Sequence, residues 1–255
     1  MLLAACAGTP EEPPYVERPA EVLYQQGMDL LAEEEFLDAA RAFEEVERQH
    51  PFSELAVRAQ VMAAYAYYEA AEYDAAIAAA ERFIELHPGH PDVPYALYLI
   101  GLSYYEQIVD VGRDQGMTEK ALAALEELVR RFPDSSYARD ARLKIDLVYD
   151  HLAGKEMEIG RFYLRRGEYL AAINRFQRVV EQYDTTSHVA EALYRLVESY
   201  LALGLEEEAR QAALVLGYNY PGDKWYARAY ALINGEPLPD EGDGGGSWFS
   251  RLWPF

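Results

Sequence analysis

The strongest constraint on the fold is a 34-residue helix-turn-helix unit, Val57 to His90, whose pattern recurs in the neighbouring segments. Residues 57–70 contain no Gly or Pro and are rich in helix formers, and a second such run extends from Ala75 to Leu86. Pro88 ends the second run because proline lacks the amide hydrogen that a helix needs. The chain is therefore predicted to be all-α and built of stacked helix pairs.

The spacing of small residues sets the boundaries of the repeats. Gly27 and Ala39 are 12 residues apart in the first repeat, whereas Gly101 and Ala121 are 20 apart in the third, so eight extra residues form a Gly-rich loop around 110–117. An extended helix over 137–152 is expected to precede the fourth repeat. The unit length predicts a right-handed α-superhelix of about five tetratricopeptide (TPR) repeats. The predicted repeats are residues 20–53, 57–90, 94–136, 153–186 and 190–223, with a capping helix over 224–233.

Cys6 is the chain's only cysteine, which excludes a disulfide within the chain and makes its position the informative property. It follows Leu3-Ala4-Ala5, the order of a bacterial lipoprotein signal in which the thiol is acylated and Cys becomes the new amino terminus. A Pro- and Glu-rich segment comes next, so residues 1–19 are predicted to be a lipobox and a flexible tether. The true start is expected upstream, and a chance match of this short motif is the alternative.

The composition changes again after Ile233. Residues 234–246 are rich in Gly, Pro and acids, which predicts a flexible acidic linker, and four of the nine residues in 247–255 are aromatic. Two interpretations stay open for this aromatic tail. It folds back onto the helical repeats, or it docks on a membrane interface or a partner.

Charge and motif content argue against several classes of function. The formal net charge of −21, from 44 acids and 23 bases, repels phosphate backbones and argues against nucleic-acid binding. The sequence has no phosphate loop, Cys cluster, zinc-protease motif or nucleophile elbow. His87 and His90 form the only close His pair, which is too few ligands for a strong metal site. We therefore predict no enzyme, no cofactor and no metal.

The first helices of the repeats supply a candidate peptide groove, because in TPR stacks these helices line the concave face. Tyrosine combines apolar area with a hydrogen-bonding tip at low entropic cost, which suits peptide capture. The alternative is that several of the 21 tyrosines only fill gaps between helices. The predicted groove consists of Tyr24, Arg58, Tyr65, Tyr68, Tyr95, Tyr98 and Tyr105, and the same positions in later repeats include Arg161, Arg165 and Tyr194.

Several stretches are more specific than the generic repeat pattern. They include Pro51-Phe52-Ser53, Ala64–Tyr68, Ala76–Ala78, Arg82–Ile84, Leu86–Pro91, Tyr95–Leu102, Arg131–Ala138 and Arg166–Arg175. Together they resemble the BamD family, the TPR lipoproteins of the outer-membrane β-barrel assembly (BAM) machinery, over roughly residues 20–222. The sequence departs from the family at Asp184, where proline is usual at a helix end, and in its aromatic tail.

This resemblance implies a periplasmic protein, anchored to the inner leaflet of the outer membrane, that binds the POTRA region of BamA and other BAM lipoproteins and receives unfolded β-barrel precursors. The family typically assigns its C-terminal repeats to BamA and its N-terminal repeats to substrate. Carried onto this sequence, the BamA face is expected around Arg161, Arg166, Asn174 and Arg175. Two other classes stay open: an envelope TPR lipoprotein scaffold for cell division or polysaccharide export, and a soluble regulatory TPR adaptor.

Overall fold

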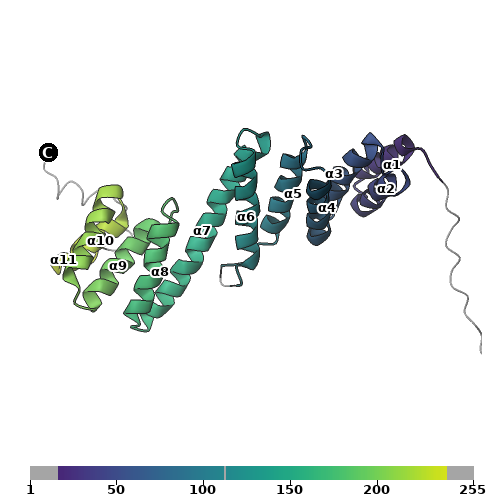
Figure 1. The fold of residues 1–255 in the computed structure, drawn as a ribbon. Helices are drawn as coiled ribbons and strands as arrows, with labels where there is room; N and C mark the ends of the chain where they lie inside the picture. The colour runs from purple at the N-terminus through teal and green to yellow at the C-terminus, as the bar shows by residue number, and fades with distance from the viewer. Residues whose placement is uncertain (1–16, 112, 240–255) are drawn as a thin grey trace, which may run out of the picture. The chain divides into compact units, whose positions relative to one another are not determined.

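The computed structural model describes residues 17–111 and 113–239, and every regular element within them is an α-helix. The helices follow one another in antiparallel pairs, so the prediction of an all-α fold of TPR-type repeats is confirmed (Figure 1). The chain divides into two compact units, one ending at Leu99 and one beginning at Ile100. The predicted lipidation at Cys6 and the aromatic tail lie outside the described residues.

The first unit contains two complete helix pairs and the start of a third helix pair. Its helices pack in sequence, α1 on α2, α2 on α3 and α3 on α4. Leu23, Phe43 and Phe83 are fully buried between them. The helices are α1 (Ala20–Ala32), α2 (Phe36–Gln49), α3 (Glu54–Glu69), α4 (Tyr73–Leu86) and α5 (Val93–Glu106), the last of which crosses the boundary between the units.

The second unit continues the pattern with one long helix near its start. The extended helix predicted over 137–152 and the first helix of the fourth repeat form one continuous helix of 30 residues, because no proline or capping residue separates them. The predicted Gly-rich insertion corresponds to the irregular segment between α5 and α6. The helices are α6 (Gly116–Arg131), α7 (Ser136–Arg165), α8 (Tyr169–Gln182), α9 (Val189–Ala202), α10 (Glu206–Asn219) and α11 (Lys224–Asn234).

Glycines on the first helix of a repeat let a bulky side chain of the second helix approach the backbone. A Cβ atom added at Gly27 would lie 2.6 Å from the Phe43 ring, and one added at Gly160 would overlap the Phe176 ring. Both rings are fully buried. These pairs explain why small and aromatic residues alternate at fixed spacing in the sequence.

Enlarging Gly160 is expected to lower the free energy of unfolding, since the added side chain overlaps Phe176 in a closely packed core. Gly160→Val should cost about 1–3 kcal/mol, measured by urea denaturation. Gly222→Ala is the control, because no atom lies within 4 Å of its added Cβ. Equal stability of Gly160→Val and the unaltered chain would show that this contact does not limit packing.

Three tyrosines on first helices are tied to the preceding second helix, and each partner lies 23 residues earlier in the sequence. The pairs are Tyr67 with Glu44 (2.7 Å), Tyr149 with Glu126 (2.7 Å) and Tyr200 with Gln177 (3.0 Å). Burial and the hydrogen bond to Glu44 raise the pKa of Tyr67 to about 12, so its hydroxyl stays a donor at neutral pH. This recurring bond helps to fix the register between neighbouring repeats.

Candidate functional site

Five of the six predicted groove tyrosines lie in the first unit, on α1, α3 and α5, together with Arg58. Each of these five side chains is half-buried, so none belongs to the fully enclosed core, and Arg58 is exposed. The five are Tyr24, Tyr65, Tyr68, Tyr95 and Tyr98. Half-burial leaves part of each ring accessible for contact with a ligand.

Tyr24 and Arg58 come together at one end of this set. The Tyr24 ring packs edge-on against Phe43 with the centroids 5.4 Å apart, which fixes its orientation. The guanidinium carbon of Arg58 lies 5.3 Å from the Tyr24 centroid, within cation–π distance. The pair therefore presents a cation held against an aromatic face.

Tyr65 and Tyr95 form a second aromatic contact, between α3 and α5. Their ring centroids are 6.5 Å apart at an interplanar angle of 41°. Burial, together with the charge and hydrogen bond of Glu69, raises the pKa of Tyr65, so the phenol is neutral at physiological pH. Tyr68 contacts Tyr73 of α4 at 6.1 Å. Aromatic rings from three consecutive helices thus lie in contact in pairs.

Two other tyrosines of the predicted set fall in the second unit. Tyr105 lies beneath the ammonium of Lys144, 5.4 Å from the ring centroid, and is half-buried. The placement of Tyr194 in a groove is wrong, because this side chain is fully buried and stacks on Trp225 at 5.2 Å. The ring of Trp225, which lies 31 residues later on α11, covers the face that the repeat count assigned to a ligand.

Asn174 and Arg175, two of the residues predicted to face BamA, come together in a polar depression of about 520 Å³ on α8. Asn174 is exposed. Arg175 is half-buried, and its Nη1 donates to Glu156 Oε2 at 3.0 Å. Arg178, one turn further along α8, donates to the other oxygen of Glu156 at 2.8 Å. A single carboxylate therefore anchors both arginines of the depression.

Glu156 was not anticipated from the sequence, although its position carries a signal. Ala153, Met157 and Gly160 are buried on the inner face of α7, and Glu156 shares their helical spacing. A glutamate on such a face needs a cationic partner, because burying an unpaired charge is costly. Arg175 and Arg178 supply that partner 19 and 22 residues later.

Arg161 and Arg166 lie in separate contacts of the second unit. Arg161 forms two hydrogen bonds to Glu191 of α9, from Nε at 2.9 Å and from Nη2 at 2.5 Å. Burial raises the pKa of Glu191, but the hydrogen bonds and charges of Arg161 and Arg195 outweigh it and lower the pKa overall. Arg166 is exposed, pairs with Glu168 at 2.9 Å and lies over Phe162. The structure thus brings Asn174 and Arg175 together, whereas Arg161 and Arg166 lie outside their depression.

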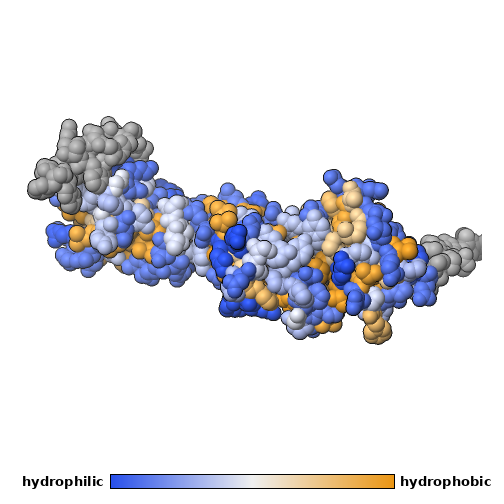
Figure 2. All heavy atoms as spheres, turned by 90° about the horizontal axis from the view of Figure 1, so that it is seen from above, coloured by the Kyte–Doolittle hydropathy of each residue, from blue (hydrophilic) through white to orange (hydrophobic). Residues whose placement is uncertain are grey.

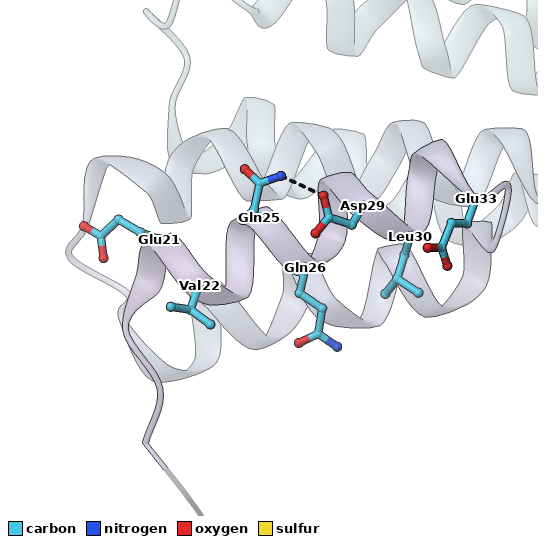
Figure 3. A pocket seen from close by; sticks show the side chains of 7 residues that line it. All are labelled: Glu21, Val22, Gln25, Gln26, Asp29, Leu30 and Glu33. Carbon is cyan, nitrogen blue, oxygen red and sulfur yellow. Dashed lines mark hydrogen bonds between the residues drawn. The ribbon is translucent and has the colours of Figure 1, made fainter.

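A further depression, of about 710 Å³, lies along the outer face of α1 and is lined by residues of that helix and by Glu33, its C-cap. Figure 3 shows these side chains, with Gln25 donating a hydrogen bond to Asp29 at 2.7 Å. The lining includes three carboxylates and no aromatic ring, so it offers no stacking surface.

The described residues contain neither a metal-ligand cluster nor a membrane-spanning helix. Among residues 17–111 and 113–239, no three His, Cys, Asp or Glu side chains are grouped closely enough to hold a metal ion. No helix in these ranges combines the length and apolar character needed to cross a membrane. Aromatic rings and paired charges are the distinctive groups of the described sites.

Comparison with known proteins identifies relatives over most of the chain. The model of a family described as YfiO, outer membrane lipoprotein, matches residues 16–215. The outer membrane protein assembly factor BamD of Caulobacter vibrioides is 55% identical over 238 residues, covering 92% of this chain and 78% of the relative. The factor of the same name from Rickettsia prowazekii is 49% identical, covering 84% and 86%, and that of Neisseria meningitidis is 36% identical, covering 90% and 91%.

Proposed function

The chain belongs to the YfiO family of outer membrane lipoproteins, and we propose that it acts in outer-membrane protein assembly by binding BamA with its second unit and unfolded β-barrel precursors with its first. It is a subunit of the BAM machinery. The observation that carries this function is the 55% identity to the Caulobacter vibrioides assembly factor over 92% of the chain. The all-α repeat fold fits a scaffold that works by contact and performs no reaction.

Depleting the protein tests this role. When its expression is switched off, the amount of folded β-barrel proteins in the outer membrane should fall several-fold, because precursors no longer reach the assembly site. Quantitative mass spectrometry of outer-membrane fractions measures the change, and lipoproteins that lack a barrel serve as the internal reference. Unchanged barrel levels after depletion would contradict the proposal.

The proposal for substrate binding is supported by the aromatic pairs of the first unit. β-Barrel precursors present extended segments with aromatic residues at alternate positions, and half-buried rings such as Tyr65 and Tyr95 offer flat surfaces for these side chains. Arg58, held over Tyr24, supplies a cation for a terminal carboxylate in an otherwise acidic protein. Aromatic burial and this local charge then provide the affinity.

The proposal for BamA binding rests on the polar depression of the second unit. Arg175 bonds Glu156 through Nη1, so the other nitrogens of its guanidinium can donate to a carboxylate of the POTRA region. Asn174 lies beside it and is exposed. Glu156 holds Arg175 in place before the partner arrives, which reduces the entropy lost on binding.

Lipidation of Cys6 is the proposed anchor, with the acyl chains providing the membrane affinity. Cys6→Ser should therefore move the protein from the membrane to the soluble periplasmic fraction, measured by fractionation and immunoblotting. The experiment uses cells without a BamA-like partner, because binding to BamA alone retains the protein. Thr9→Ser in the same tether is the control and should leave the distribution unchanged. Persistent membrane association of Cys6→Ser would contradict the anchor.

A further inference from the structure

An apolar trough on the second unit lies beside the polar depression and has no role in the functions above. It has a volume of about 500 Å³ and is lined by α8, α9 and α10. Val180, Tyr200 and Val215 are the partly or fully exposed apolar side chains of its lining, whereas Leu193 and Leu196 form its buried floor. Val215 is 43% exposed, although a valine of this kind is usually covered. Figure 2 shows that apolar patches interrupt the hydrophilic surface on the face it draws.

The edge of the trough is acidic. Glu181 of α8 and Glu207 and Glu208 of α10 are exposed and line it. An occupant that matches both properties has an apolar or aromatic body and carries a positive charge.

The path of the chain leads to this edge. α10 and α11 are joined by a short turn and pack against each other, so they run antiparallel. The 11 residues of α11 span about 16 Å. Because α11 runs back along α10, its end is expected near the level of Glu208, which lies 11 residues before Asn219, the last residue of α10. Gly235 then adopts a left-handed conformation with φ of 68°, and the amide of Glu236 donates to the carbonyl of Ala231 at 2.8 Å, which ends the helix.

The next segment has the chemistry that the trough requires. Residues 247–255 contain four aromatic side chains, Leu252 and one cation, Arg251. The nine residue-to-residue steps from Pro239 to Trp248 reach up to about 30 Å when extended and average about 15–18 Å as a Gly-rich, acidic tether. We propose that residues 247–255 dock within the same molecule in the trough, with aromatic side chains on Val180, Tyr200 and Val215 and with Arg251 near the acidic edge.

The tether makes this contact effective even when it is weak. A short flexible linker holds its end at an effective concentration in the millimolar range, so a segment with millimolar affinity is bound much of the time. Docking also shields aromatic side chains that would otherwise favour association between molecules. The same trough is then unavailable to external peptides of similar chemistry while the tail occupies it.

Disulfide trapping in the full chain tests the proposal. In a Cys6→Ser background, Val215→Cys is combined with Leu252→Cys, and the control pairs Leu252→Cys with Arg210→Cys, an exposed position of α10 outside the trough. We expect intramolecular oxidation at least about ten-fold faster for the Val215 pair than for the control, since docking raises the local thiol concentration. Equal rates, or disulfide-linked dimers as the main product, would overturn the proposal.

Proteolysis provides a second measurement that requires no cysteine in the trough. Arg251 is the only lysine or arginine after Arg228, so trypsin reports the accessibility of the tail by releasing residues 252–255. Val215→Glu should speed this release several-fold, whereas Arg210→Glu should leave it unchanged, with both variants helical by circular dichroism. Equal release from Val215→Glu and the unaltered chain would show that the tail does not occupy the trough.

Discussion

Replacing Tyr65 and Tyr98 together by alanine is expected to abolish binding of a peptide that carries the C-terminal aromatic motif of a β-barrel protein. The unaltered chain should bind this peptide in the micromolar range, as expected for a modest, reversible contact. Truncating an aromatic residue at the centre of such a contact costs about 2 kcal/mol, so two truncations weaken binding about 1,000-fold when their effects add. Fluorescence anisotropy of a labelled peptide measures the loss.

Two controls separate a receptor surface from a packing role of these tyrosines. Phe52→Ala removes a fully exposed aromatic ring of the same unit and should leave peptide binding unchanged. BamA binding by the Tyr65 and Tyr98 double variant should also persist, because a repeat stack couples mainly nearest neighbours. Equal binding of a scrambled peptide, or loss of both activities together, would contradict the groove.

Arg175→Ala is expected to weaken binding to the BamA POTRA region about 30-fold or more. Removing one member of a close interfacial charge pair costs about 2–5 kcal/mol, and the lower figure corresponds to this change in affinity. Isothermal titration calorimetry with purified POTRA domains measures it. The effect should appear mainly in the dissociation rate, as is usual for variants of one interface.

The fold should survive this change because Arg178 remains 2.8 Å from Glu156 and still compensates its buried charge. Circular dichroism and the urea midpoint of Arg175→Ala should therefore stay close to those of the unaltered chain. Arg210→Ala removes an arginine that is paired with Glu206 on the exposed surface of α10, and it serves as the matched control for binding. A lowered urea midpoint of Arg175→Ala with unchanged affinity for the POTRA domains would show that Arg175 has a structural role and that the BamA face lies elsewhere.

The repeat architecture was predictable because its determinants are close in sequence. Gly27 and Phe43 belong to one helix pair, so the spacing of small and bulky residues reveals the contact directly. The boundary predicted between residues 152 and 153 was harder to interpret, because no helix ends there. The helix α7 continues through this boundary to Arg165. The helical character of each segment and the number of repeats follow from local residue patterns. Whether two successive helices join depends instead on whether a helix-terminating residue such as proline lies between them.

The candidate sites were predictable only in part, because side-chain partners come from other helices. Arg175 was identified as a surface residue, but its bond to Glu156 depends on how α7 and α8 pack. Tyr194 has the same repeat position as groove tyrosines, yet Trp225 of the last helix covers it. A repeat count assigns a direction to each side chain and cannot show which neighbour occupies the space in front of it.

Affinity purification of the intact, tagged protein from envelope membranes tests the central claim most directly. The membranes are solubilised in mild detergent, and the proteins retained are identified by mass spectrometry. We expect a β-barrel protein with POTRA domains to be the most abundant partner and Arg175→Ala to reduce its recovery greatly. Recovery of cell-division or polysaccharide-export components without such a barrel protein would contradict the account.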